Sequence, residues 1–166
     1  MVIPRIGQGI DVHPFLAPGD PARPLVLCGV EIADGAGLAG HSDADVGFHA
    51  VADALLGAAA LGDLGSWFGV DRPETAGADS ADLLAAVVAD VAATGWQLSN
   101  LDLTLVAQRP RLAPYRDRMR QNLAKVCAVE VAAVSVKFTT TDHLGALGRG
   151  EGVLGSAVCL LVPLQG

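Results

Sequence analysis

The sequence is poor in aromatic residues and in basic charge. Aromatic side chains make up 4% of the 166 residues although 51% are hydrophobic, so the core must be built from aliphatic side chains. Lys and Arg total 11 against 18 Asp and Glu, which gives a formal charge of -7. A general nucleic-acid binder needs a basic field, so we expect no nucleic-acid partner.

Cysteine is also scarce. Cys28, Cys127 and Cys159 are far apart, lie in apolar stretches and match neither metal-binding nor redox spacing. We therefore expect buried free thiols, as in a reducing compartment. The N-terminus shows no apolar leader, and the longest apolar run, 54–61, is too short to span a bilayer. These absences predict a cytoplasmic protein without a membrane partner.

What is present fits one domain, 1–166, without repeats or linkers. Hydrophobic periodicity predicts strands at 2–12, 25–32, 98–107, 134–138 and 153–164, and helices at 43–61, 81–94 and 115–126. We expect the first two strands to form a hairpin and the last, almost wholly apolar, to be buried on both faces. Strands and helices mix without strict alternation, which predicts an α+β fold with a mixed sheet and helices on one face, including ferredoxin-like βαβ elements.

Two of the four histidines lie in Gly40-His41-Ser42-Asp43-Ala44-Asp45-Val46-Gly47-Phe48-His49, which opens the first helix. Ser42 is predicted as its N-cap, with Asp45 as the second member of a short-armed capping box. His49 then faces the same way as the buried stripe of the helix. His41 precedes the helix start, beside backbone N–H groups that favour anions.

The first strand carries a second pair of donors. Asp11 and His13 are two residues apart, so an extended backbone points both to one side. Gly7 and Gly9, in the same strand, indicate the close approach of another backbone or of a ligand. Together with His49, the pair offers one oxygen and two nitrogens, the pattern of a catalytic metal site with an open position, and imidazoles favour zinc. The alternative is a turn-capping Asp with core or surface histidines.

Four further stretches carry candidate contacts, and three of them have a purely structural alternative. Hydroxyls and a carboxylate in 139–142 can contact phosphate and a divalent cation, although Thr also simply favours strands. Glycines around Arg149 let the backbone approach an anion. The basic loop 108–112 could be only solvated, and Asp63 could be only a turn former. The stretch 67–77 is predicted as a loop over the site, and Ser80 as the cap of the following helix.

Six stretches in order resemble one family, the 2-C-methyl-D-erythritol 2,4-cyclodiphosphate synthases. They are 9–13, 40–49, 53–65, 77–80, 139–142 and 148–152. The resemblance spans nearly the whole chain. It departs from the family pattern at Gln8 (often His), Asp142 (usually Glu), Ala146 (often aromatic) and in the 68–72 loop, which lacks the common Pro and has fewer acids than is common.

The resemblance implies a phosphorus-oxygen lyase of isoprenoid (terpenoid) biosynthesis by the non-mevalonate route. Such an enzyme cyclises 4-diphosphocytidyl-2-C-methyl-D-erythritol 2-phosphate and releases CMP, the substrate's own 2-phosphate attacking the β-phosphorus. No protein nucleophile is needed, and the sequence shows no activated Ser, Cys or Lys arrangement. Catalysis then depends on positioning and charge neutralisation. A homotrimer with its sites at subunit interfaces is also implied.

The resemblance assigns roles residue by residue. Zn²⁺ is held by Asp11, His13 and His49, and a Mg²⁺ or Mn²⁺ ion bridges the diphosphate near Asp142. His41 and Thr140 match residues that steady the transition state. The implied substrate contacts are Asp11, Val12, His13, His41, Ser42, Asp63, Leu64, Gly65, Phe68, Gly69, Val70, Asp71, Arg72, Ala107, Gln108, Arg109, Pro110, Arg111, Leu112, Ala113, Thr139, Thr140, Thr141, Asp142, Ala146 and Arg149.

Within that set, 107–113 with Thr139 and Thr141 match the cytidine pocket, and 68–72 match a substrate loop. Arg149 matches an arginine either at the phosphates or in the central trimer channel. Two rival functions keep some of these features: a zinc hydrolase of phosphate esters or nucleotides, and a non-catalytic trimeric binding module with an apolar channel gated by Arg149 and Glu151.

Overall fold

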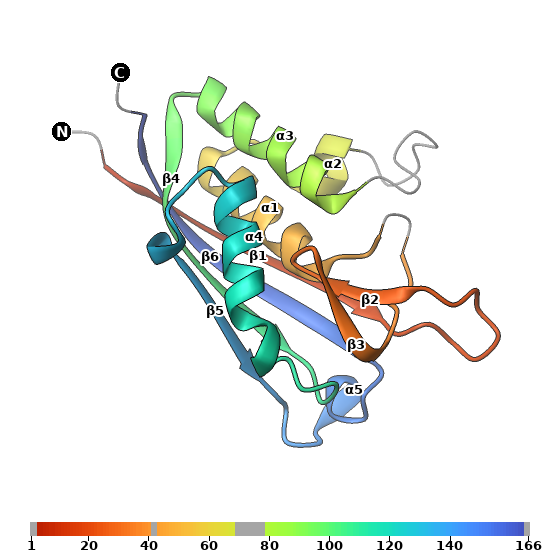
Figure 1. Ribbon diagram of the computed structural model, residues 1–166. Helices are drawn as coiled ribbons and strands as arrows, with labels where there is room; N and C mark the ends of the chain where they lie inside the picture. Colours follow the sequence, from red (N-terminus) through yellow and green to blue (C-terminus); the bar gives the residue numbers. More distant parts are fainter. Residues whose placement is uncertain (1–2, 41–42, 69–78, 165–166) are drawn as a thin grey trace.

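The computed structural model describes residues 3–40, 43–68 and 79–164 (Figure 1). A four-stranded sheet with strand order β1-β6-β4-β5 forms its centre. The strands are β1 (Arg5–Pro14), β4 (Trp96–Val106), β5 (Val134–Thr139) and β6 (Gly152–Pro163). β6 runs antiparallel to β1 and β4, whereas β4 and β5 are parallel. The predicted mixed sheet is confirmed.

Three long helices pack on one face of this sheet: α1 (Val46–Ala59), α3 (Ser80–Ala93) and α4 (Arg116–Val126) (Figure 1). Because α4 connects the parallel strands β4 and β5, the predicted βαβ element is present. The shorter helices are α2 (Leu64–Phe68), α5 (Gly145–Gly148) and the 3₁₀ turns Ala113–Tyr115 and Val131–Ala133. No helix in the described part of the chain is long and apolar enough to cross a membrane.

α1 lies directly against β1, and glycine makes this possible. A Cβ atom added to Gly7 would lie 1.9 Å from the carbonyl oxygen of Ala54, and one added to Gly9 would lie 2.1 Å from that of Ala50. No side chain fits in that space, so the strand and the helix backbone touch. The expected close approach at these glycines is confirmed, and it brings the far end of β1 beside the start of α1.

The core between the sheet and the helices is aliphatic, as expected. Phe48 is the one aromatic residue among the fully buried hydrophobic residues that the structure describes. Cys28, Cys127 and Cys159 are buried and free, which confirms the prediction for the thiols.

The predicted strand 25–32 is wrong. The chain instead forms a separate two-stranded hairpin, β2 (Pro24–Leu27) and β3 (Val30–Ala36). Cys28 and Gly29 between them have φ values of 51° and 67°, the left-handed backbone that a tight two-residue hairpin turn requires. This turn divides the apolar run, and β1 pairs with β6 rather than with the second strand.

The expectation that the last strand is buried on both faces is also wrong for the single chain. Residues of β6 alternate between buried and more exposed positions. The sheet face away from the helices carries exposed apolar side chains, which are 44–73% accessible at Ile6, Ile10, Val12 and Val158. β1 also continues past the predicted end at Val12, as far as Pro14.

Both predicted N-caps are displaced by the tertiary structure. Asp45, not Ser42, caps α1, because its side chain accepts hydrogen bonds from the N–H groups of Gly47 and Phe48. Asp79 caps α3, so Ser80 is the first residue inside that helix. The predicted loop 67–77 begins as helix, since α2 extends to Phe68.

Candidate functional site

The candidate site lies at the end of β1, just beyond the glycines where this strand contacts α1. Odd-numbered residues of β1 face α1, so Asp11 and His13 continue the row that starts with Gly7 and Gly9. Both side chains are partly accessible, 24% for Asp11 and 21% for His13. The predicted same-side arrangement is therefore confirmed. The side chain of Val12 lies on the opposite face, away from the metal-ligand candidates.

Asp45 positions His49, which follows it by one turn of α1. The carboxylate of Asp45 is completely buried and, besides capping the helix, accepts hydrogen bonds from the N–H groups of Cys28 (2.8 Å) and Gly29 (2.7 Å). It thus ties the turn of the β2–β3 hairpin to the helix start. Burial raises the pKa of Asp45 to about 6, although the N–H donors favour the charged form.

Asp11, His13 and His49 meet in one group, as predicted. The Oδ2 atom of Asp11 lies 3.1 Å from Nε2 of His13 and 3.0 Å from Nδ1 of His49. The potential ligand atoms all lie within 4.8 Å of one another. A tetrahedral zinc with bonds of about 2.0–2.1 Å separates its ligands by roughly 3.3 Å, so the spacing fits a shared cation.

The chemistry of the donors supports the same conclusion. Nδ1 of His13 lies 2.8 Å from the carbonyl oxygen of Ala39, which can only accept, so this nitrogen carries the proton. In the neutral ring, Nε2 then turns a lone pair toward Asp11. Lone pairs converging on one point repel unless a cation or a proton lies among them. The residues therefore fit a divalent metal.

Without metal, hydrogen bonds with the two histidines stabilise the negative charge of the Asp11 carboxylate. Burial by itself raises the pKa of Asp11, but the hydrogen bonds with His13 and His49 outweigh burial and bring it well below its usual value. The hydrogen bond with Asp11 raises the pKa of His13. A proton shared by Asp11 and His13 thus takes the place of the metal between these two side chains.

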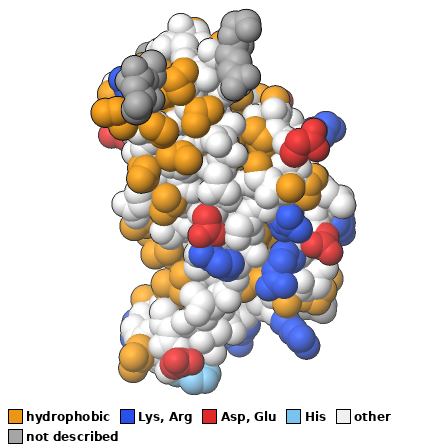
Figure 2. All heavy atoms as spheres, turned by 90° about the vertical axis from the view of Figure 1, so that its left-hand side faces the viewer, with side chains coloured by type: hydrophobic (Ala, Val, Ile, Leu, Met, Phe, Trp, Pro, Cys, Tyr) orange, Lys and Arg blue, Asp and Glu red, His pale blue; other side chains and the backbone are white. Residues whose placement is uncertain are grey.

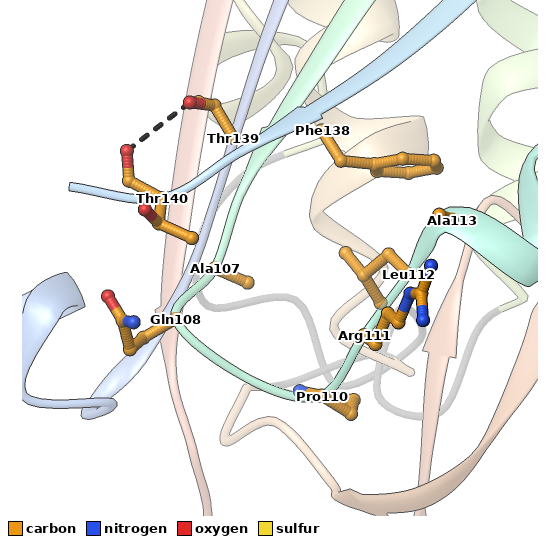
Figure 3. Close-up of a pocket in the computed structure, with 9 residues that line it drawn as sticks. All are labelled: Ala107, Gln108, Pro110, Arg111, Leu112, Ala113, Phe138, Thr139 and Thr140. Carbon is orange, nitrogen blue, oxygen red and sulfur yellow. Dashed lines mark hydrogen bonds between the residues drawn. The ribbon is translucent and has the colours of Figure 1, made fainter. Parts of the chain in front are cut away.

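A pocket of about 270 Å³ lies where β4 and β5 end (Figure 3). The loop after β4 curves around it, and Phe138, Thr139 and Thr140 approach from β5. Its lining residues are Ala107, Gln108, Pro110, Arg111, Leu112, Ala113, Phe138, Thr139 and Thr140. Most of the residues predicted for the cytidine pocket are thereby brought together. Phe138 was not among them, although its aromatic side chain at a strand end was a usable signal.

Arg109 and Thr141 do not line this pocket. Arg109 instead lines a neighbouring cavity with Phe15 and Leu16. The hydroxyl of Thr141 donates to the carbonyl oxygen of Leu144 at 2.6 Å, which shapes the turn into α5.

The loop before α2 is exposed and ordered by its own side chains. Asp63 accepts a hydrogen bond from the N–H of Ser66 (2.7 Å), which lowers the pKa of its carboxyl, and Asp53 of α1 accepts one from the N–H of Leu64 (2.7 Å). Leu64 and Gly65 are the first residues of α2. Asp63 thus forms a turn. Its contact with substrate stays a prediction.

The remaining described candidates are not part of the group formed by Asp11, His13 and His49. Thr140 donates to Oδ1 of Asp142 at 3.3 Å, and both are exposed, as is Ala146. Arg149 forms an exposed ion pair with Glu151 (2.6 Å). Asp142 does not belong to the Asp11 group. His41, Ser42 and 69–72 lie outside the described residues, as does the side chain of Phe68.

Sequence reasoning missed the residues that contact His49 through Nε2, the ring nitrogen that does not face Asp11. Nε2 of His49 lies 2.9 Å from the hydroxyl of Ser80, and that hydroxyl donates to Asp43. Ser80 had been interpreted only as a helix cap and Asp43 only as the start of the helix. Their proximity depends on how α3 packs against α1, which the local pattern does not contain.

Fold and site together define an α+β protein with a candidate metal centre and a separate ligand-sized pocket. Residues 4–162 match the YgbB family, and the chain belongs to this family. A relative from Chromobacterium violaceum named 2-C-methyl-D-erythritol 2,4-cyclodiphosphate synthase is 53% identical over 157 residues, covering 95% of this chain and 97% of its own. The resemblance predicted from the motifs is confirmed.

Solved structures agree with this assignment. The bifunctional IspDF from Campylobacter jejuni superimposes with a TM-score of 0.92 at 36% identity, over 98% of this chain and 43% of its own. The Plasmodium falciparum IspF CDP complex has a TM-score of 0.84 at 30% identity, over 98% and 97% of the two chains. The latter was solved with CDP, a nucleotide ligand.

Proposed function

We propose that the chain catalyses the cyclisation of 4-diphosphocytidyl-2-C-methyl-D-erythritol 2-phosphate to 2-C-methyl-D-erythritol 2,4-cyclodiphosphate, with release of CMP, in isoprenoid precursor synthesis. The observation that carries this function is the convergence of Asp11, His13 and His49 in a chain whose relatives are named for the reaction. Since one phosphate of the substrate attacks another and CMP leaves, the reaction is a phosphorus-oxygen lyase reaction.

The three side chains would hold Zn²⁺, which imidazole ligands favour. A divalent cation at this position neutralises phosphate oxygens and makes the phosphorus easier to attack. The protein's share is to fix the geometry: β1 supplies two ligands and α1 the third, on backbones that touch at Gly7 and Gly9. Rigid placement of this kind is what phosphoryl transfer requires.

Asp142 would hold a second cation, Mg²⁺ or Mn²⁺, which would neutralise charge on the diphosphate. The exposed carboxylate accepts a hydrogen bond from Thr140, and hydroxyl and carboxylate oxygens suit hard cations. Asp142 stands where the family usually has Glu, so its carboxylate, one methylene shorter, would hold this cation. Thr140 and His41 then steady the transition state.

The cytidine end of the substrate would occupy the pocket shown in Figure 3. A volume of about 270 Å³ is at the small end for a ligand site, where roughly 300–1,000 Å³ is common. A site completed by a second subunit accounts for this small volume. Ser42, 63–65 and 68–72 would contact the erythritol part. Arg149 would serve the phosphates or the central channel of the trimer, and Ala146 would be a further substrate contact.

A homotrimer explains the apolar face of the sheet. Figure 2 shows a band of hydrophobic side chains along one side of the molecule. Ile6, Ile10, Val12 and Val158 of β1 and β6 are exposed on the sheet face that no described helix covers. An apolar surface of this kind marks an interface between proteins.

The free, buried cysteines fit a location in the reducing cytoplasm.

Product analysis tests the reaction. Purified protein with Zn²⁺ and Mg²⁺ should convert the substrate to CMP and a cyclic diphosphate, identified by phosphorus NMR, with no oxygen taken from isotopically labelled water. A linear diphosphate containing solvent oxygen would instead identify a hydrolase. Binding of CDP without any turnover would identify a binding module.

Replacing one ligand tests the metal centre. His49→Ala should lower turnover by about 1,000-fold or more, because the cation loses a nitrogen donor from α1. Zinc content after purification without chelator should fall in parallel, whereas the melting temperature of the metal-free variant should stay near that of the metal-free wild type. Unchanged turnover would contradict the proposed role of the group.

A further inference from the structure

His49 has two ring nitrogens, and both have partners. Nδ1 lies 3.0 Å from Oδ2 of Asp11, on the metal side, and Nε2 lies 2.9 Å from Oγ of Ser80, on the side of α3. Ser80 is 1% accessible and is, with Asp45, one of two buried polar residues in the described part of the chain. A buried hydroxyl must satisfy its own hydrogen bonds, so its partners determine how it interacts with His49.

The hydrogen-bond partners of Ser80 allow only one orientation of its hydroxyl group. Its hydroxyl donates to Oδ1 of Asp43, and its backbone N–H donates to Oδ2 of the same carboxylate at 3.1 Å. The N–H of Asp45 donates to Oδ1 of Asp43 at 3.2 Å. A carboxylate provides only acceptors for these three donors, so the Ser80 hydroxyl proton points to Asp43. The lone pairs of Ser80 are left for His49.

This arrangement selects the tautomer of His49. Since Ser80 turns a lone pair toward Nε2, that nitrogen must carry the proton, so the neutral ring of His49 has its lone pair on Nδ1, the nitrogen that faces Asp11. His13 is held in the corresponding way by Ala39, through its other ring nitrogen. In its neutral form, each imidazole thus presents its unprotonated nitrogen to the same point, where a metal would bind.

We propose that Ser80, held by Asp43, is a positioning residue that fixes the tautomer and ring orientation of His49 for metal binding. The inference rests on the proposed metal centre and deepens it: neither residue touches the metal, and both act through His49. Metal-ligating imidazoles depend on such partners, whose loss typically costs 10–100-fold in metal affinity.

The test compares two alanine variants on the same helix. Ser80→Ala removes the acceptor facing His49. Thr94→Ala removes a hydroxyl that donates to the carbonyl oxygen of Val91 at the other end of α3 (2.7 Å), far along the helix from His49. In metal-free protein titrated with Zn²⁺ against a chromophoric chelator, we expect zinc affinity to fall about 10–100-fold in Ser80→Ala and to stay within about twofold of wild type in Thr94→Ala.

A spectroscopic signature separates positioning from general destabilisation. Long-range proton–nitrogen NMR on ¹⁵N-labelled, metal-free protein, at a pH where His49 is neutral, reports which imidazole nitrogen is protonated. Wild type and Thr94→Ala should show only the Nε2–H form of His49, and Ser80→Ala should show a mixture or broadened signals.

Asp43→Asn provides a second variant that preserves size. An amide nitrogen must replace one of the oxygens that accept the three donors, and an amide that donates to Ser80 lets the hydroxyl proton turn toward Nε2 of His49. This favours the tautomer in which Nδ1 is protonated and cannot bind metal. We expect weaker zinc binding in this variant as well.

The outcomes are distinguishable. If wild type binds zinc no better than His49→Ala, the proposed metal centre itself is wrong. If wild type binds zinc but Ser80→Ala and Asp43→Asn bind it equally well, with His49 still in one tautomer, only the positioning role is overturned. Equal losses in Thr94→Ala and Ser80→Ala would also overturn it, since destabilising α3 would then be sufficient.

Discussion

Asp45 combines complete burial with four backbone hydrogen-bond donors. It caps α1 through Gly47 and Phe48 and holds the hairpin turn through Cys28 and Gly29. The donors favour its charged form and burial favours its neutral form, with burial the larger effect. The protonation of Asp45 therefore makes the stability of the structure around His49 depend on pH.

The free energy of unfolding should depend on Asp45 between about pH 4 and pH 6. In the unfolded chain the carboxyl has an ordinary pKa near 4, whereas in the folded protein it is about 6. The folded state then binds the proton more tightly, so the stability that protonation contributes is full at about pH 4 and is lost as the pH rises through 6. A shift of this size corresponds to about 3 kcal/mol at most.

Urea unfolding of metal-free wild type and Asp45→Asn, at one protein concentration and several pH values, measures this. The asparagine does not titrate, so the stability of wild type minus that of the variant should decrease with rising pH across the window. A difference that is constant or increases with pH would mean that the four N–H donors outweigh burial.

At the scale of elements, the contact of β1 with α1 matters most for the site. β1 carries Asp11 and His13 while α1 carries His49, so the ligand set exists only if the two backbones meet. Gly7 and Gly9 allow this, and the same helix contains Gly57, whose added Cβ would have 4.0 Å of space. The two kinds of glycine should therefore respond in opposite ways to the same substitution.

Gly9→Ala should destabilise the fold by about 3 kcal/mol or more, because its Cβ would lie 2.1 Å from the carbonyl oxygen of Ala50. It should also weaken zinc binding, because β1 must move away from His49. Gly57→Ala, on the exposed side of α1, should stabilise the protein by about 0.5–1 kcal/mol by restricting the unfolded chain. Denaturant unfolding and zinc titration of both variants test the contact, and equal effects would contradict it.

At the scale of the whole molecule, helices cover one face of the sheet, whereas no described helix covers the other face, which exposes apolar side chains of β1 and β6. β6 is the clearest case, since it is almost wholly apolar in sequence but its Val158 is 44% accessible. A strand of this composition is ordinarily buried on both sides. The proposed homotrimer provides the missing cover.

Val158→Asp should therefore dissociate the assembly. A carboxylate on the open face would have to be buried without a partner in the interface, which costs several kcal/mol per subunit. Mass photometry should show trimers for wild type and monomers for the variant, and turnover should fall if each site needs two subunits. As a control, Asp117→Ala changes an exposed residue of α4, on the helix side of the sheet, that pairs with Arg120, and it should leave assembly unchanged. A trimeric Val158→Asp variant would contradict the proposed interface.

The metal ligands were accessible to sequence reasoning because their geometry is local. The two-residue period of a strand places Asp11 and His13 on one side, and the period of a helix turns His49 inward. Gly7 and Gly9 indicate a close contact of the strand with another backbone. The hairpin was not accessible, because Cys28 adopts a left-handed conformation that its residue type rarely takes. The pairing of β1 with β6 joins opposite ends of the chain, and periodicity carries no information about partners at that distance.

By itself, the sequence determined the family, the mixed α+β class, the aliphatic core and the donors that could bind a cation. These follow from residue type and spacing, which are properties of the chain. Only the tertiary structure decided which acid caps which helix and which hydroxyl stands behind His49. Ser42 and Asp45 are equally good caps in isolation, and Asp45 is selected because its carboxylate also reaches the N–H groups of the hairpin turn. Such choices depend on which buried donors meet which acceptors once the layers have packed.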